Sequence, residues 1–166
     1  MANKYIELRT DGRQAQKEAT VVSTGALNAG EIVALDGTGR IDVSVLPLGV
    51  GPDISLLETT ENLVAGDYVN IYNASGVAKV RKADGSNGRD AHGFVKAAYT
   101  IGQTANIYFE GPNENLTGLT PGARYYLNTN GQVSATPRTS GIHQFVGYAV
   151  STTAINTDID DLIVLV

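Results

Sequence analysis

The stretches that decide the fold are LNAGEIVALDGTGRI (residues 27–41), LVAGDYVNIYNASGV (residues 63–77) and LTPGARYYLNTNGQV (residues 119–133). In each stretch a leucine is followed three residues later by a glycine, then by apolar residues at alternate positions. A polar turn follows and ends in Gly39, Gly76 or Gly131. Alternating apolar positions are typical of a strand with one buried face, and glycine supplies the positive φ that tight hairpin turns require. The stretches therefore predict three β-hairpins of one repeated design.

The correspondence continues beyond the second and third stretches. GFVKAA from Gly93 matches GYAVST from Gly147, and we align ANIYFEG from Ala105 with DLIVLV from Asp161. We therefore expect two related β-modules and a less complete first copy. The predicted division is an N-terminal arm (1–19), a first partial module (20–62), a second module (63–111) and a third module (112–166).

The rest of the chain favours an all-β fold. From residue 20 onward, short runs rich in Val, Ile, Tyr and Thr alternate with Gly, Asn, Asp and Ser turns, and no long window carries a helical apolar stripe. We predict repeated small β-barrel or β-tulip-like modules with an extended N-terminal arm. The 19 glycines cost backbone entropy on folding, so we expect such modules to draw stability from one another and from assembly.

The first 19 residues differ from the rest. KYIELR (residues 4–9) could form a short strand, and the following DGRQAQKEA (residues 11–19) has no apolar stripe at either period. A frayed terminus is one interpretation. The other is an arm that becomes ordered on a partner.

The charge balance and cysteine content exclude several classes of protein. The chain has 12 Lys and Arg against 17 Asp and Glu, a net charge of −5 at pH 7. This balance disfavours nucleic-acid binding, because neutralising phosphates takes clustered basic residues. The absence of cysteine excludes disulfides, thiolate metal sites and thiol nucleophiles. No run approaches the ~18 apolar residues of a membrane span, and we expect neither a signal peptide nor a membrane partner.

Neither histidine stands in a catalytic pattern. His92 lies near Asp90, His143 has no acidic neighbour in the sequence, and each precedes a predicted strand. The acidic run TDIDD (residues 157–161) could face one cation, but it lacks the fixed glycine and terminal glutamate of a calcium loop. We interpret these residues as turn or strand-edge positions. We expect no enzyme activity, no catalytic residue, no metal, no cofactor and no small-molecule substrate.

The tyrosines suggest contact surfaces rather than a catalytic site. Neighbouring residues of a strand face opposite sides of a sheet, so Tyr125 and Tyr126 cannot both be buried in one core. One of them should face outward, toward solvent or a partner.

One long stretch carries a resemblance. DYVNIYNASGVAKVRKADGSNGRDAHGFVKAAYTIGQTANIYFEG (residues 67–111) resembles the head decoration, or capsid cement, proteins of tailed bacteriophages, including the small trimeric decoration protein of lambda-like phages. The shared order is a strand, a turn, a return strand ending in Ala-Asp-Gly, a glycine with a small apolar strand, a Thr-rich loop and a last strand ending in Gly. LTPGARYYLNTNGQVSATP (residues 119–137) followed by VGYAVSTTA (residues 146–154) is similar to segments of phage head, tail-fibre and baseplate proteins.

The resemblance implies a β-tulip or barrel-like module, commonly trimeric, on the outer face of an expanded capsid. It also implies an N-terminal arm that becomes ordered on the shell, sometimes by adding a strand to a capsid sheet. The matching residues are Lys4, Tyr5, Ile6, Glu7, Leu8 and Arg9. Lambda-like decoration proteins carry one such module, so the doubled module departs from their pattern.

We therefore expect a structural virion protein, made in the bacterial host cytoplasm, that binds the major capsid protein as a homotrimer and stabilises the shell by bridging neighbouring subunits. The alternative is a head-fibre, tail-fibre or baseplate component whose modules bind a receptor or glycan. A receptor binder would expose its adhesive surface on distal loops such as residues 84–92.

Overall fold

The computed structural model describes residues 4–46 and 53–165, and the prediction of an all-β fold is confirmed. The chain divides into two units, Met1–Gly51 and Pro52–Val166, which we describe separately. Apart from two single-turn 3₁₀ helices, the described elements are strands paired in antiparallel sheets. No helix in these residues is long and apolar enough to cross a membrane.

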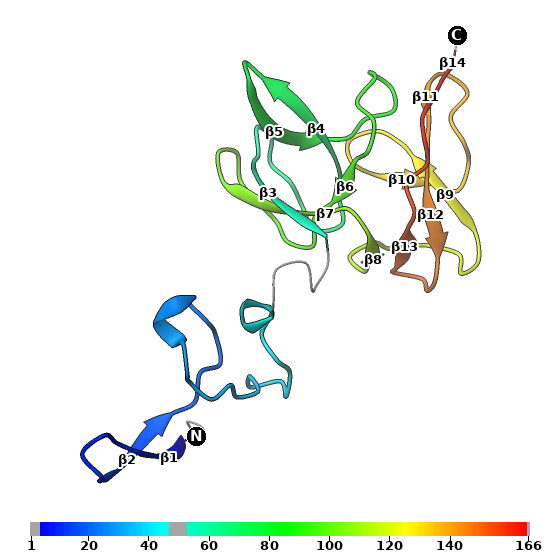
Figure 1. The fold of residues 1–166 in the computed structure, drawn as a ribbon. Coiled ribbons are helices and arrows are strands. Elements are labelled where there is room, and N and C mark those ends of the chain that lie inside the picture. Colours follow the sequence, from blue (N-terminus) through cyan, green and yellow to red (C-terminus); the bar gives the residue numbers. More distant parts are fainter. Residues whose placement is uncertain (1–3, 47–52, 166) are drawn as a thin grey trace. The chain divides into compact units, whose positions relative to one another are not determined.

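The N-terminal unit contains one β-hairpin and two short helical turns (Figure 1). β1 (Lys4–Leu8) pairs with β2 (Gln14–Glu18) in a two-stranded sheet, and η1 (Ala26–Asn28) and η2 (Val43–Val45) follow. The segment after residue 9 thus forms a strand although it lacks apolar alternation. It does so because the turn after β1, where Gly12 has φ 79° and its N–H donates to the Arg9 carbonyl, reverses the chain.

The first five strands of the C-terminal unit form one sheet, which we call the central module. They are β3 (Ile54–Glu58), β4 (Tyr68–Ala74), β5 (Val77–Lys82), β6 (Gly93–Phe94) and β7 (Thr104–Tyr108). Their order in the sheet is β3-β7-β6-β4-β5. A single parallel bridge between Thr59 and Val80 joins the two ends of the sheet. The sheet curls around its core, but the described strands do not form a closed barrel.

The remaining strands form what we call the C-terminal module. They are β8 (Gly111–Asn113), β9 (Arg124–Leu127), β10 (Val133–Ser134), β11 (Gly141–His143), β12 (Phe145–Ala149), β13 (Ile155–Thr157) and β14 (Ile163–Leu165). Five of them form a sheet in the order β10-β9-β12-β13-β8, and β11 pairs with β14 in a separate two-stranded ribbon. Figure 1 shows the two modules side by side.

The two five-stranded sheets have the same topology. Read from the first strand of each module, the orders are β3-β7-β6-β4-β5 and β8-β13-β12-β9-β10. The residue registers also agree, because Phe94 pairs with Tyr68 as Tyr148 pairs with Arg124. The repeat recognised in the sequence is therefore a duplication of a whole sheet.

A glycine at the same place in both sheets shows why the repeat keeps that residue. Gly93 faces the backbone of β7, and a Cβ there would lie 2.9 Å from Ile107 Cγ2. Gly147 faces β13 in the same way, and a Cβ would lie 2.7 Å from Ile155 Cγ2. At both positions neighbouring strands approach too closely for a side chain.

This correspondence corrects the alignment of the last strands. The counterpart of β7 is β13, which pairs with β12 as β7 pairs with β6. DLIVLV instead supplies β14, which pairs with β11, so its alignment with ANIYFEG was wrong. The structure also places Ile54–Glu58, which the sequence division put in the partial module 20–62, in the central sheet beside β7.

Two hydrophobic clusters hold the C-terminal unit together. The first fills the curled central sheet and contains six buried residues: Leu63, Val69, Val80, Val95, Ala105 and Ile107. The second combines residues of both modules, including Tyr68 and Phe94 from the central sheet with Leu127, Val146 and Ile155 from the C-terminal one. The two modules therefore fold as one body, as expected for modules too small to bury much surface alone.

Candidate functional site

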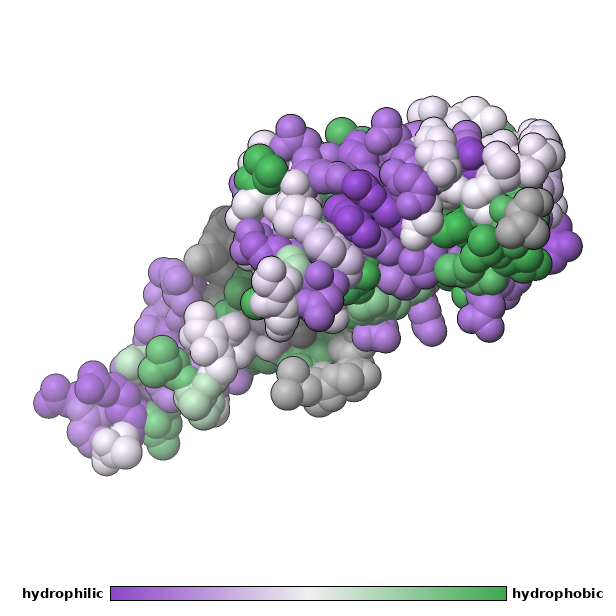
Figure 2. Space-filling model, turned by 90° about the horizontal axis from the view of Figure 1, so that it is seen from above, coloured by the Kyte–Doolittle hydropathy of each residue, from purple (hydrophilic) through white to green (hydrophobic). Residues whose placement is uncertain are grey.

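The N-terminal unit has secondary structure without a core. None of the side chains that the structure places in residues 4–42 and 44–46 is buried, while nine large apolar side chains are exposed: Ile6, Leu8, Val22, Leu27, Ile32, Val33, Leu35, Ile41 and Leu46. Hydrophobic residues reach the surface of this unit among hydrophilic ones (Figure 2). A segment of this kind lacks the apolar burial that normally offsets the entropy of ordering a chain. A partner surface could supply it.

Polar contacts join the parts of the N-terminal unit. The Glu31 carboxylate accepts hydrogen bonds from the Thr20 hydroxyl and the Asn28 amide, and Lys17 Nζ lies 3.5 Å from it. These groups lower the pKa of Glu31, the Thr20 hydroxyl contributing most. Contacts of this type at a partly exposed position stabilise a fold only weakly.

The candidate arm is one strand of a hairpin rather than a free extended segment. Lys4 to Leu8 form β1, paired along their whole length with β2, and Arg9 begins the turn. Ile6 is 62% exposed and Leu8 is 71% exposed. Because the sheet has two strands, each uses only one edge for pairing. The other edge of β1 has the backbone groups needed to add a strand to a partner sheet.

The three turn glycines all lie in the left-handed region. Gly39, Gly76 and Gly131 have φ values of 79°, 91° and 76°. The second and third close the hairpins β4–β5 and β9–β10. The first copy differs from its prediction, because residues 27–41 contain no strand, and Val33 makes only an isolated bridge to Thr20. The local turn forms, but no neighbouring strands extend it into a ladder.

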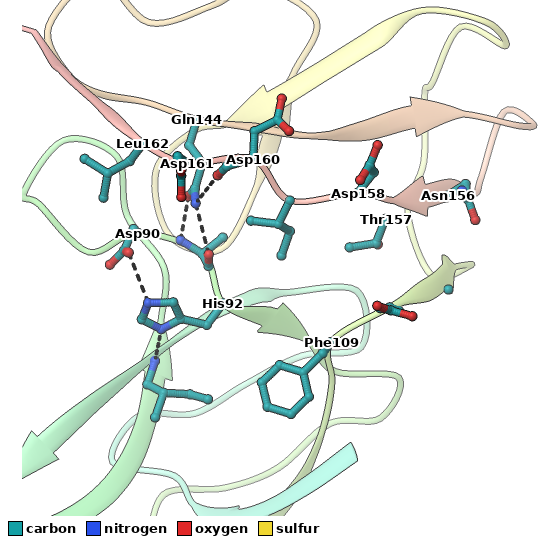
Figure 3. A pocket seen from close by; sticks show the side chains of 15 residues that line it. Asp90, His92, Phe109, Gln144, Asn156, Thr157, Asp158, Asp160, Asp161 and Leu162 are labelled. Atoms are coloured by element: carbon teal, nitrogen blue, oxygen red, sulfur yellow. Dashed lines mark hydrogen bonds and ion pairs between the residues drawn. The ribbon is translucent and has the colours of Figure 1, made fainter. Parts of the chain in front are cut away.

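A groove of about 1230 Å³ opens within the C-terminal unit (Figure 3). One wall consists of central-module residues, among them Ile71, His92 and Phe109. The other consists of residues 156–162 of the C-terminal module, which follow β13. Buried Gln144 ties the walls together, since its Oε1 accepts from the Ala91 N–H (2.7 Å) and its Nε2 donates to the carbonyls of Ala91 and Asp160 (both 3.1 Å).

The groove is acidic. Its lining includes the carboxylates of Asp90, Glu110, Asp158, Asp160 and Asp161, and within the described lining the only basic type of residue is His92. His92 Nε2 lies 3.0 Å from Asp90 Oδ2, and its Nδ1 accepts the Ile71 N–H at 2.9 Å. The ring is thus held by its neighbours. No group of three or more His, Cys, Asp or Glu in the described ranges could hold a metal ion.

Other residues singled out in the sequence are structural in this fold. Tyr125 is buried and Tyr126 is half-buried on the opposite face, where its ring lies 5.0 Å from that of His143. Loop 84–92 is partly packed between the modules, because Gly85 and Ala91 are buried and Ile142 donates its N–H to the Gly85 carbonyl. Only residues 86–88 of this loop are exposed.

The sequence did not predict that these acidic residues line one groove. Its acidic residues come from three segments, around positions 90, 110 and 160, and no single motif contains them. The repeat was a signal that pointed to part of the groove. With the corrected alignment, Phe109 and Thr157, which both line it, occupy corresponding positions just after β7 and at the end of β13.

Comparisons with known proteins give one likeness. No family model and no curated protein matches the chain. Among solved structures, it is similar to the head fiber gp8.5 N base of bacteriophage phi29, with 10% sequence identity and a TM-score of 0.47. The match covers 65% of this chain and 95% of that one.

Proposed function

We propose that this chain is a non-enzymatic structural protein of a tailed-phage particle, which decorates the outer capsid surface as a homotrimer. In this proposal the N-terminal unit binds the major capsid protein, and the C-terminal unit forms the body that projects from the shell. The proposal rests on the sequence resemblance to capsid decoration proteins and on the N-terminal unit. It does not rest on the likeness to the phi29 structure.

The single observation that carries the proposal is the coreless N-terminal unit. Its nine exposed aliphatic side chains have no buried neighbours within the unit's described residues. Fully burying one such side chain contributes roughly 1.5–3 kcal/mol, so burying several of them on a capsid surface can offset the entropy lost on association. The free edge of β1 adds main-chain hydrogen bonds to a capsid strand in the same step.

Multivalency explains how such contacts stabilise a shell. When one arm of an oligomer is bound, the others bind at a high effective concentration, so modest single contacts give tight attachment. If the arms contact different capsid subunits, opening the shell requires breaking several of them at once. The decoration protein then acts as a clamp between neighbouring subunits.

The alternative function is that of a receptor-binding fibre component, for which the sequence suggested loop 84–92 as the adhesive surface. Most of that loop packs against the C-terminal module through Gly85 and Ala91, so little of it is available to a receptor. Capsid attachment through the N-terminal unit is therefore the function that we favour.

A co-sedimentation experiment tests the proposal. The full chain, mixed with expanded empty capsids of the virus from which the sequence comes, should sediment with them. The double variant Ile6→Asp, Leu8→Asp should bind at least about tenfold more weakly, because two carboxylates would be placed in an apolar contact. Deletion of residues 1–12 should have the same effect.

The control is Ile101→Asp, which changes a side chain of similar exposure (66%) on a turn of the C-terminal unit. It should bind capsids like the unmodified chain. Equal binding by all variants would contradict attachment through the N-terminal unit.

A further inference from the structure

The duplicated sheets place corresponding residues in different surroundings. On the outer face of the central sheet, Tyr68 and Phe94 are fully buried. Their register counterparts in the C-terminal sheet are Arg124 and Tyr148, of which Arg124 is exposed and Tyr148 is 43% exposed. One face is covered within the chain, and the matching face is open.

The covered face is buried by the C-terminal module of the same chain. Tyr68 and Phe94 belong to one hydrophobic cluster with Leu127 and Val146, and the Tyr68 hydroxyl lies 3.2 Å from Thr157 Oγ1. Burial raises the pKa of Tyr68 to about 12, so the phenol is neutral in this contact. The outer face of one module thus docks on the end of the next module's sheet.

The central module has the same receiving end, and it is open. By register, Leu127 corresponds to Ile71, and Thr157 corresponds to Phe109. Leu127 and Thr157 are buried by the docked face, whereas Ile71 and Phe109 are only half-buried. Both line the acidic groove. Among the described residues, each chain therefore presents one exposed outer face and one half-buried receiving end.

We propose that copies of this chain assemble head to tail, the outer face of the C-terminal module of one copy docking in the groove of the central module of the next. The contact repeats the arrangement that joins the two modules inside each chain. Because it pairs two different surfaces, it is heterologous, and closure of the repeated rotation gives a ring. Modules of both kinds then alternate around that ring.

The chemistry of the two surfaces is complementary. The open face carries Tyr148, whose ring centroid lies 5.0 Å from that of the buried Phe145. The Arg124 guanidinium lies 5.0 Å from the Phe145 ring and 5.5 Å from the Tyr148 ring. The groove offers apolar Ile71 and Phe109 between carboxylates. A cation on an aromatic platform fits an acidic groove with an apolar floor, and desolvation on docking strengthens the ion pairs formed.

The intrachain contact predicts which residues meet between copies. Since Tyr68 touches Thr157, their counterparts Arg124 and Phe109 should meet across the new interface. Glu110 follows Phe109, lines the groove and is exposed, so it can be substituted without disturbing the core. This contact does not depend on the proposed attachment to a capsid.

Cross-linking of the full chain tests the proposal, because the protein has no cysteine of its own. Two single variants, Val150→Cys and Glu110→Cys, are mixed in equal amounts and treated with a short bismaleimide. Val150 is 60% exposed and lies two residues beyond Tyr148, so this variant keeps Arg124 and the aromatic rings of the open face. We expect a covalent dimer from the mixture, with a yield several-fold above that of either variant alone. The matched control mixes Val150→Cys with Ile101→Cys, which lies on an exposed turn outside the groove, and should give little product.

Two results would overturn the proposal. One is a yield from the first mixture no higher than that of the control, as expected if the aromatic face binds another ligand such as a glycan. The other is efficient cross-linking of Val150→Cys with itself, which would indicate a contact between like faces. Both variants replace exposed side chains, so circular dichroism should show an unchanged fold.

Discussion

Gly131 and Gly76 end corresponding turns of the two modules, yet their surroundings differ. Both have positive φ, which costs an L residue about 1–2 kcal/mol. Around Gly76 there is open space, whereas a Cβ on Gly131 would lie 3.0 Å from Asp67 Cβ and 3.0 Å from the Tyr68 carbonyl oxygen. The turn of the C-terminal module is thus also part of the contact between modules.

This difference gives a prediction for alanine variants. Gly76→Ala should lower the free energy of unfolding by about 1 kcal/mol through backbone strain alone. Gly131→Ala should lower it by about 2–4 kcal/mol, because overpacking adds to the same strain. Urea unfolding followed by circular dichroism measures both values, and equal losses would show that the turn does not contribute to the module contact.

Asp84 connects the two modules electrostatically. Burial alone would raise its pKa, but hydrogen bonds from the Ser86 hydroxyl (2.6 Å) and amide (2.9 Å) and from the Asn130 amide (3.3 Å) outweigh it and lower the pKa below the ordinary 3.8. A lowered pKa in the folded state means that the carboxylate stabilises the fold above pH 3.8. That stabilisation is lost as the pH falls through the lowered value.

We therefore expect Asp84→Asn to lower the free energy of unfolding by roughly 1 kcal/mol at pH 7, the usual contribution of such hydrogen bonds. The difference in stability between Asp84→Asn and the unmodified chain should narrow as the pH falls below 3.8, because the Asp84 carboxyl of the unmodified chain becomes protonated. Thermal unfolding at pH 7, 4 and 3 measures this difference. A difference that stays constant across the series would show that the charge of Asp84 is not involved.

The strand Phe145–Ala149 depends on a side chain just before it. Gln144 is 3% exposed, and its amide satisfies both backbone polar groups of Ala91 in the other module. Gln144→Leu would leave that buried N–H and C=O without these partners, at about 1–3 kcal/mol for each unsatisfied group.

Gln103→Leu is the matched control, because Gln103 is exposed and its side-chain oxygen accepts the Thr100 N–H outside the core. Calorimetry should show a melting temperature several degrees lower for Gln144→Leu and nearly unchanged for Gln103→Leu. Similar small shifts for both variants would mean that water satisfies Ala91 when the glutamine is lost.

The elements that the sequence could predict are those whose pairing is local. The hairpins β4–β5 and β9–β10 follow from alternating apolar residues and a closing glycine, and both formed. β8 and β13 were missed, because segments as short as GPN and INT carry no alternation and owe their pairing to distant strands. Residues 27–41 have the same local pattern as the hairpins, but without neighbouring strands only the turn at Gly39 formed.

The candidate surfaces show the same division between local and distant information. The sequence indicated that KYIELR could form a short strand, and its first five residues, Lys4–Leu8, are β1. The acidic groove was not recognisable, because its carboxylates meet only through the packing of the two modules. The face around Tyr148 is a candidate docking surface because its counterpart Phe94 is buried, and a sequence alone does not reveal that burial.

Across the whole chain, two units with different sources of stability are joined. Residues 53–165 contain two hydrophobic clusters, one of which is shared by both modules, so their strands should hold their fold without a partner. No side chain of residues 4–42 and 44–46 is buried, so the backbone amides of this unit should exchange with solvent readily when the protein is free. If the N-terminal unit attaches to a capsid as proposed, binding should change amide exchange in the N-terminal unit and leave exchange in the C-terminal unit nearly unchanged.

Hydrogen–deuterium exchange of the full chain, free and bound to expanded empty capsids, tests this claim most directly. We predict that amides of Lys4–Leu8, Gln14–Glu18 and the rest of residues 4–46 exchange fast in the free protein. On the capsid they should slow by a factor on the order of ten or more, while those of β4, β7, β9 and β12 change little. Unchanged exchange of residues 4–46 in capsid-bound protein would contradict the account.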